Sequence, residues 1–377
     1  MKLMDIETPA ALIDEARMAA NIDRMQLHLT ALGVRLRPHV KTSKCIEVAR
    51  RQQEAGAQGI TVSTLKEAEQ FFAAGFSDIL YAVCMAPDKL DRALALIRRG
   101  CALTILVDSM PAAEAVVAKG KAEARAFDVM IEIDSDGHRS GVQPEAADLI
   151  EIGAILQAGG QRVKGVLTHA GSSYDLDTAE ALEKLAEQER ALCVRAAERL
   201  RAAGIACPEV SVGSTPTALA ARNLAGVTEV RAGVYVFFDL VMSNVGVCAP
   251  GQVALSVLAT VIGHQAEKGW VIVDAGWMAM SRDRGTQRQK IDYGYGAVCD
   301  AAGHVLDGLV VSGANQEHGI VSRRDGTTDP GIVERFPIGT RLRLLPNHAC
   351  ATGAQYPNYL AVASDGSATV WPRFQGW

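Results

Sequence analysis

Short apolar segments alternate with longer amphipathic ones along the first two thirds of the chain, and this alternation is the strongest constraint on its fold. The segments between the apolar ones contain many Ala, Leu, Glu and Arg residues, and Thr178–Ala203 stops at a glycine. The apolar segments are Val34–His39, Gly59–Ser63, Asp78–Val83, Leu103–Asp108, Val129–Asp134, Val163–His169, Glu209–Gly213 and Glu229–Phe237. Eight strands alternating with helices predict a (β/α)8 barrel, an α/β fold, rather than an open doubly wound sheet.

The pattern changes after about residue 245, where the long Ala-rich helices disappear. The strand-like segments that follow are Val253–His264, Trp270–Asp274, Val305–Ser312, Arg341–Leu345 and Tyr359–Ala363. Strand-like segments without long helices between them are typical of a β-rich domain. We therefore predict a barrel over residues 14–245 and a β-rich C-terminal domain over residues 246–377. Residues 1–13 are predicted to belong to the β-rich domain as well.

Composition limits the class of protein. The chain has 377 residues, of which 49% are hydrophobic, enough for a sizeable core, and its formal net charge is −5. Acidic and basic residues are interspersed, so we expect no nucleic-acid partner and no membrane surface. The chain begins without the apolar core of a signal peptide, and its eight cysteines show neither disulfide-like nor CxxC spacing. We expect a cytoplasmic protein with reduced thiols.

Lys41 follows the first predicted strand, within Arg37-Pro38-His39-Val40-Lys41. In a barrel of parallel strands, the carboxyl ends of the strands and the loops after them carry the chemistry. A lysine at this place is suited to act as a nucleophilic amine or as a proton carrier. The alternative is a surface lysine, because most lysines are solvated.

The segment Gly213-Ser214-Thr215 ends the seventh predicted strand and begins a helix. Glycine allows the backbone to approach a ligand closely, and hydroxyl and N–H groups at a helix start attract anions. Barrel enzymes bind phosphate at late loops of this kind. The alternative is a helix N-cap that satisfies only its own backbone. With Lys41 on the first strand, the segment suggests a phosphorylated cofactor linked to a lysine.

Two further strand ends carry polar side chains. Arg139 can donate to a phenolate or carboxylate at the barrel mouth, whereas Asp134 and Asp136 are interpreted as local backbone caps. His169 and Tyr174 follow the next strand and offer an imidazole ring to cover a planar cofactor and a phenol. The alternative for His169 is a structural hydrogen-bonding role.

His348 and Cys350 form a His-x-Cys pair late in the chain. In an extended segment, side chains two residues apart project from the same face, so this imidazole and thiolate are expected to share a divalent metal ion. Two protein ligands are too few for a structural zinc site. They suit an open site that water and substrate complete.

Together these segments resemble the alanine-racemase-like (fold type III) family of pyridoxal-phosphate enzymes, in its D-serine dehydratase and D-threonine aldolase branch. The resemblance covers essentially the whole chain, including Arg231-Ala232-Gly233-Val234-Tyr235 late in the barrel. It implies that Lys41 holds pyridoxal 5'-phosphate as a Schiff base and that Arg139 lies near its phenolic oxygen. It also implies a divalent metal (Zn, Mn, Co or Mg) on His348 and Cys350. The cofactor-binding residues expected from these motifs are Lys41, Arg139, His169, Tyr174, Gly213, Ser214, Thr215 and Tyr235.

The resemblance further implies a lyase acting on a small β-hydroxy amino acid. Dehydratases of this branch carry His-x-Cys where aldolases tend to place an aspartate at the position of Cys350, so we expect loss of water from 3-hydroxyaspartate, giving oxaloacetate and ammonia. The alternatives are D-serine dehydration, an aldolase reaction, or a non-catalytic pyridoxal-phosphate-binding protein. A homodimer is also implied.

Overall fold

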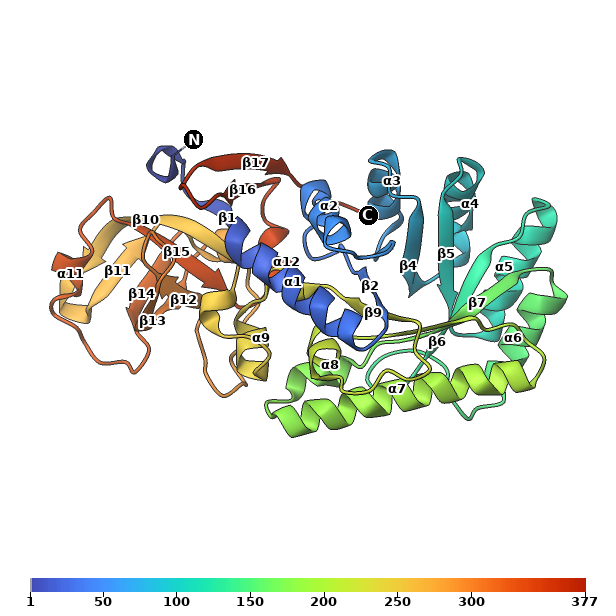
Figure 1. The fold of residues 1–377 in the computed structure, drawn as a ribbon. Coiled ribbons are helices and arrows are strands. Elements are labelled where there is room, and N and C mark those ends of the chain that lie inside the picture. The colour runs from blue at the N-terminus through green and yellow to red at the C-terminus, as the bar shows by residue number, and fades with distance from the viewer. Residues whose placement is uncertain (1) are drawn as a thin grey trace. The chain divides into compact units, whose positions relative to one another are not determined.

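A computed structural model describes residues 2–377, shown in Figure 1. The chain forms two compact units, one of Arg24–Gly233 with the last two residues and one of residues 2–23 with Val234–Gln375. The chain passes from one unit to the other within helix α1 (Glu15–Ala31) and returns between Gly233 and Val234. The domain limits expected from the sequence stay a prediction, and each unit is described by itself below.

The first unit contains a barrel of parallel strands. Every pairing in its eight-stranded sheet is parallel, in the order β2-β9-β8-β7-β6-β5-β4-β3. A bridge between His39 and Thr61 joins the two end strands and closes the ring. The strands are β2 (Arg35–Pro38), β3 (Ile60–Val62), β4 (Asp78–Cys84), β5 (Ala102–Val107), β6 (Asp128–Ile133), β7 (Arg162–Thr168), β8 (Glu209–Val212) and β9 (Glu229–Ala232). The predicted (β/α)8 barrel is thereby confirmed.

Helices alternate with these strands, as the sequence indicated. Several begin where their sequence supplies a cap: the side chain of Thr64 accepts the N–H of Glu67 at the start of α3, and Thr178 does the same for Ala181 at the start of α7. The helices are α2 (Ile46–Glu54), α3 (Leu65–Ala73), α4 (Leu90–Arg98), α5 (Met110–Ala122), α6 (Asp148–Ala158), α7 (Ala179–Ala202) and α8 (Thr215–Ala220).

The last barrel strand is shorter than predicted. The apolar run to Phe237 suggested one long strand, but β9 ends at Ala232 and a 3-10 turn occupies Val234–Val236. The strand stops at Gly233, where a Cβ atom would lie 3.0 Å from the Thr42 hydroxyl and 3.1 Å from the His39 carbonyl. The chain after β2 therefore packs against the chain after β9, and apolar composition alone did not indicate this close approach.

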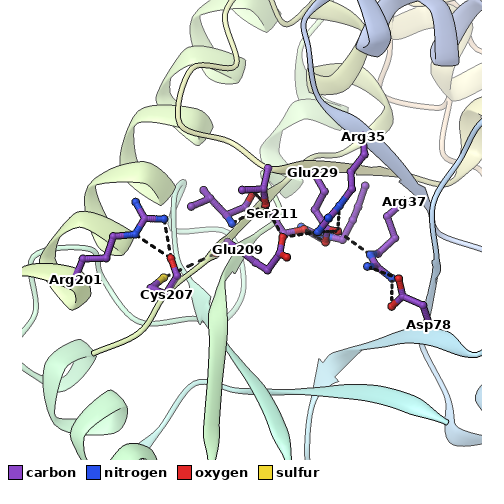
Figure 2. A network of polar contacts seen from close by, with 11 residues as sticks. Arg35, Arg37, Asp78, Arg201, Cys207, Glu209, Ser211 and Glu229 are labelled. Atoms are coloured by element: carbon purple, nitrogen blue, oxygen red, sulfur yellow. Dashed lines mark hydrogen bonds and ion pairs between the residues drawn. The ribbon is translucent and has the colours of Figure 1, made fainter. Parts of the chain in front are cut away.

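The barrel unit contains a group of ionic contacts from strands β2, β4, β8 and β9 and an apolar cluster from strands β4 to β7. Glu229 on β9 accepts hydrogen bonds from Arg37 (2.8 Å) and from Ser211 (2.7 Å), and Arg37 reaches Asp78 on β4 (2.9 Å), as Figure 2 shows. Arg37 crosses over β3 at Gly59, where a Cβ atom would collide with its guanidinium. The apolar side consists of Leu80, Leu106, Met130 and Leu167 on strands β4 to β7.

The second unit is β-rich, as predicted. Its nine-stranded sheet has the order β11-β14-β13-β12-β15-β10-β1-β16-β17, and β11 also pairs with β10, so six of the strands form a closed ring. All pairings are antiparallel apart from that of β1 with β16. The strands are β1 (Ala10–Asp14), β10 (Leu255–Gln265), β11 (Trp270–Val273), β12 (Gly296–Cys299), β13 (Val305–Ala314), β14 (Gly319–Arg323), β15 (Arg341–Pro346), β16 (Asn358–Val362) and β17 (Ala368–Pro372).

Four of these strands, β1, β12, β14 and β17, were not predicted from the sequence. Each has four or five residues. Short helices interrupt the sheet, namely α9 (Leu240–Val245), α10 (Trp277–Met280), α11 (Ile332–Arg335) and α12 (Ala349–Gly353). Among residues 2–377, no helix is both long enough and apolar enough to cross a lipid bilayer.

Candidate active site

Lys41 lies at the carboxyl end of β2, where the sequence placed it. The strand ends at Pro38, the N–H of Val40 donates to the carbonyl of Thr61 on β3, and the side chain of Lys41 is exposed. The hydrogen bond from Val40 holds the backbone immediately before the lysine while leaving its amine accessible. This is the arrangement that a nucleophilic amine requires.

Two histidines lie near Lys41 within the barrel unit. Burial, together with the positive charges of Lys41 and Arg231, lowers the pKa of His39 well below its ordinary value. Burial also lowers the pKa of His169 to about 3, and Lys41, Arg231 and Arg139 act in the same direction. Both imidazoles are therefore neutral at physiological pH. Nδ1 of His169 lies 3.1 Å from the carbonyl of Gly213, so this nitrogen carries the proton and Nε2 is left as an acceptor.

Arg139 is held at the barrel mouth by a buried carboxylate. Glu132 on β6 accepts from the guanidinium of Arg139 (3.3 Å), from the hydroxyl of Ser140 (3.2 Å) and from the thiol of Cys84 (3.1 Å). Asp134 accepts the N–H groups of Asp136 and Gly137, so this aspartate caps the local turn. A guanidinium with one side bound to Glu132 and the rest exposed can still receive a ligand oxygen.

The segment predicted to bind phosphate forms the start of α8. The side chain of Ser214 accepts the N–H of Thr217 in a capping box and bonds to the hydroxyl of Ser173 (2.9 Å). The N–H of Gly213 donates to the buried carboxylate of Glu189 on α7 (3.1 Å). The helix-cap alternative therefore describes Ser214 in this structure, while the role of Gly213, Ser214 and Thr215 in phosphate binding stays a prediction.

The two predicted tyrosines fall in different units. The ring of Tyr174 is tilted toward that of His169, with 6.2 Å between the ring centroids, so it belongs to the group around Lys41. Tyr235 lies in the second unit and is fully buried there.

His348 and Cys350 approach each other, although not for the reason that the sequence suggested. The segment is extended only at His348, which is the N-cap of the short helix α12, whereas Cys350 lies within that helix. A side-chain hydrogen bond nevertheless links the imidazole and the thiol. The pairing thus comes from a helix start rather than from strand alternation, a correction to the predicted geometry.

The surroundings of this pair are acidic. Nδ1 of His348 lies 2.6 Å from the carboxylate of Asp283, and Asp239 accepts the N–H of Ala349 between the two candidate ligands (3.0 Å). Burial disfavours the charged imidazole, yet the hydrogen bonds to Asp283 and Cys350 and the negative charge nearby raise the pKa of His348 to about 11. The hydrogen bond to His348 lowers the pKa of Asp283. The carboxylates around His348 therefore favour a positive charge at this place.

Another group of possible ligand atoms lies at the barrel mouth. Among residues 2–377, Cys84, Asp108 and Glu132 bring a thiol and two carboxylates within 4.8 Å of one another. Burial and the charge of Glu132 raise the pKa of the Cys84 thiol far above its ordinary value, so it stays protonated and donates to Glu132. We interpret this group as the hydrogen-bonded support of Arg139.

Sequence reasoning missed five residues of these two sites. His39 precedes Lys41 by two positions within Arg37-Pro38-His39-Val40-Lys41, so its closeness to Lys41 in the sequence was a signal. No local signal marked the others, because their contacts join segments that lie far apart in the chain. These are Glu132, Glu189, Asp239 and Asp283.

Both candidate sites fit the groups that the resemblance implies. Nδ1 of His39 is shielded from solvent and has no hydrogen-bond partner among residues 2–377, and a buried polar atom of this kind calls for a ligand. Near it lie the amine of Lys41, the guanidinium of Arg231 and the neutral imidazole of His169, a set suited to an anionic carbonyl compound such as pyridoxal 5'-phosphate. In the second unit, imidazole nitrogen and thiolate sulfur suit zinc or a similar divalent ion.

The fold and these groups define an alanine-racemase-like protein with a lysine at the end of its first barrel strand. The chain belongs to this family: residues 13–241 match the alanine racemase N-terminal domain, and residues 254–362 match the putative serine dehydratase domain. It is 68% identical over 376 residues to D-threo-3-hydroxyaspartate dehydratase of Delftia sp. strain HT23, covering 100% of this chain and 99% of that one.

More distant relatives and a solved structure are also similar to this chain along nearly its full length. D-serine dehydratase of Dictyostelium discoideum is 29% identical, covering 96% of this chain and 94% of its own. D-threonine aldolase of Arthrobacter sp. is also 29% identical, covering 98% and 92%. The structure of the Delftia dehydratase superposes with a TM-score of 0.98 at 67% identity and covers both chains completely.

Proposed function

We propose that this protein is a lyase that converts D-threo-3-hydroxyaspartate into oxaloacetate and ammonia. It would use pyridoxal 5'-phosphate on Lys41 and a divalent metal on His348 and Cys350. The observation that carries the proposal is the 68% identity to the Delftia dehydratase along the full length of both chains.

The metal site has separate support. Solved variants of the Delftia enzyme include a cysteine-to-alanine form without metal and a histidine-to-alanine form, and the two substituted positions are two residues apart. His348 and Cys350 have the same spacing. The acidic surroundings described above favour a cation at this place.

The chemistry divides between the bound groups and the protein. When bound, pyridoxal 5'-phosphate supplies a sink for the electrons left at the α-carbon, and the metal supplies a Lewis acid for the β-hydroxyl. Once it is free of the cofactor, the Nζ atom of Lys41 would take the α-proton. Loss of the β-hydroxyl with a proton, as water, would leave an enamine product, and hydrolysis of the enamine would release ammonia and oxaloacetate.

The other candidate residues are proposed to bind and orient the cofactor. Arg139 presents a cation that Glu132 holds in place, and His169 stays neutral so that it offers Nε2 as an acceptor without adding charge. Gly213, Ser214 and Thr215 are the proposed phosphate contacts, as helix starts attract anions. Tyr174 and Tyr235 complete the proposed cofactor residues.

Product identification tests the proposal. The purified protein, loaded with pyridoxal 5'-phosphate and Zn²⁺ or Mn²⁺, is mixed with D-threo-3-hydroxyaspartate, and oxaloacetate and ammonia are measured with and without a chelator. We expect metal-dependent formation of both. Lys41→Ala should lower turnover by about 10²–10⁴-fold through loss of the base alone, whereas the exposed Lys89→Ala serves as the matched control.

Other products would point to the alternative reactions. Glycine and glyoxylate would make the protein an aldolase, and pyruvate formed faster from D-serine would make it a D-serine dehydratase. Bound cofactor without turnover of any β-hydroxy amino acid would leave a pyridoxal-phosphate-binding protein. Each of these outcomes contradicts the proposed reaction.

We also propose a homodimer, on the strength of the family resemblance, and light scattering of the purified protein tests it. A cytoplasmic location is proposed from the cysteines, because no disulfide forms among the eight cysteines of residues 2–377.

A further inference from the structure

Asp283 contacts the imidazole of His348 although it lies 65 residues earlier in the chain. The Nδ1 atom of His348 donates to Oδ2 of Asp283 at 2.6 Å. Because this bond commits the Nδ1 proton, Nε2 is the ring nitrogen that can give up its proton and bind a metal ion. The contact therefore selects the tautomer that a metal ligand needs.

The carboxylate of Asp283 is itself fixed in orientation. Its Oδ1 atom accepts the N–H of Gly285 at 2.8 Å, which leaves Oδ2 directed at the imidazole. Its own N–H donates to the hydroxyl of Ser281 at 3.1 Å. Both bonds lie within the loop, so the loop presents a preset carboxylate rather than a mobile one.

The loop is also tied to the chain that carries the candidate ligands. The side-chain amide of Asn347, the residue before His348, donates to the carbonyls of Asp283 (3.2 Å) and Gly294 (2.8 Å). The hydroxyl of Thr352 in α12 donates to the carbonyl of Met280 at 2.7 Å. Hydrogen bonds on both sides of the His-x-Cys pair thus hold Asp283 next to His348.

Ser281 opens this loop in a conformation that is normally reserved for glycine. Its backbone has φ 74° and ψ 163°, and the residue is buried. Strain at a non-glycine residue persists only where the surroundings impose it, and it gathers at functional sites. Here the strained turn directs the chain so that Asp283 meets the imidazole.

From this geometry we infer that Asp283 is a positioning residue of the metal site, one that fixes the tautomer and orientation of His348 through its carboxylate. A histidine that binds a metal usually donates its other N–H to such a group, which orients the ring and makes it a better ligand. The inference rests on the proposed function for its role in catalysis, whereas the effect on metal binding is independent of any substrate.

Zinc affinity of the full-length protein tests the inference. Asp283→Asn, Asp283→Ala and Asp283→Glu are compared with the wild type by competition with a chromophoric chelator. We expect the Asn and Ala forms to bind zinc about 10–100-fold more weakly, and the Glu form to retain most of the affinity. Asp292→Asn is the control, because this carboxylate lies in the same loop but pairs with Arg284.

Cobalt substitution gives a second readout. The absorption bands of bound Co²⁺ should keep their thiolate character in Asp283→Asn while the ligand-field bands shift, since the orientation of His348 changes and Cys350 does not. An unfolded Asp283→Asn variant would show neither set of bands. In that case, Asp283→Glu is compared with the wild type instead.

The outcomes separate this inference from the proposed function. Equal zinc affinity in the wild type and in Asp283→Asn overturns the inference, as does a wild type that binds no zinc. A wild type that binds zinc but forms no oxaloacetate overturns the proposed reaction, while the ratio of affinities still decides the role of Asp283.

Discussion

At the scale of single residues, the barrel site contains buried histidines held without charge. His169 donates from Nδ1 to the Gly213 carbonyl, and burial with the cations around it lowers its pKa to about 3. A neutral imidazole beside Lys41 and Arg139 avoids a further positive charge. The same feature makes folding sensitive to acid, because the unfolded chain binds a proton that the folded protein excludes.

We predict that His169→Gln reduces the sensitivity of stability to acid. The folded pKa of His169 lies below its ordinary value of 6.5, so its contribution is unchanged at neutral pH and stability is lost as pH falls from about 6.5 toward 3. The loss is about 1.4 kcal/mol per pH unit in that window for one such group. Urea unfolding at pH 7 and pH 5 measures it in both proteins.

The matched control is His304→Gln, since His304 is an exposed histidine in the second unit. It should lose the same stability as the wild type between the two pH values. If His169→Gln also follows the wild type, His169 is not the neutral buried group described here.

At the scale of elements, helix α7 supports the ends of two barrel strands through one side chain. Oε1 of the buried Glu189 accepts the N–H of Ala170 after β7 (2.9 Å) and the N–H of Gly213 after β8 (3.1 Å). Burial raises the pKa of Glu189, and its bonds to Thr217, Ala170 and Gly213 oppose that rise. The helix therefore sets the spacing of the loops that are proposed to hold phosphate.

We predict that Glu189→Ala destabilises the protein by about 1–3 kcal/mol for each buried N–H left without a partner. Glu189→Gln keeps an acceptor oxygen in the same place and should cost much less. Urea unfolding gives the free energies, and titration with pyridoxal 5'-phosphate should show weaker binding only for the Ala form. Equal losses in the two variants would contradict the role of the Oε1 atom.

Strands β2 and β9 share the ionic part of the barrel core. Removing one partner of a buried ion pair leaves the other charge unpaired, so Glu229→Ala should lower the free energy of unfolding by about 3–5 kcal/mol. Glu145→Ala is the control: its side chain is 65% exposed in its pair with Arg195, and exposed pairs of this kind contribute little to stability. Chemical unfolding of both variants decides whether Glu229 differs from a surface carboxylate.

At the scale of the whole molecule, most residues of the two candidate sites come from different units, although the predicted cofactor residue Tyr235 lies in the β-rich unit. Lys41, Arg139 and His169 belong to the barrel unit, whereas His348, Cys350 and Asp283 belong to the β-rich unit. The two groups of residues share no member, so each ligand should be removable without the other.

We predict that a chelator abolishes oxaloacetate formation while the absorption of bound pyridoxal 5'-phosphate remains. Adding Zn²⁺ back should restore activity without added cofactor, because the residues around Lys41 are unaffected by metal loss. Loss of the cofactor band together with the metal would show that the two sites depend on each other. Dialysis against buffer without chelator is the control.

Several local features were predictable from the sequence. The barrel followed from strand-like segments separated by capped helices, and the position of Lys41 followed from the end of the first of them. Asp134 could be interpreted as a turn cap because its partners lie two and three residues away. The closeness of the His348 and Cys350 side chains was expected, although the helix start that brings them together was not.

What the sequence determined by itself depends on neighbours along the chain: alternating apolar residues form strands, hydroxyl residues cap helices, and a lysine after a parallel strand reaches the barrel mouth. The tertiary structure alone decided which distant groups meet. Asp283 reaches His348 across 65 residues, and Glu132 reaches Cys84 across 48. Such contacts depend on how strands and loops pack in three dimensions, and no local period encodes the partner of a side chain that folding brings from elsewhere.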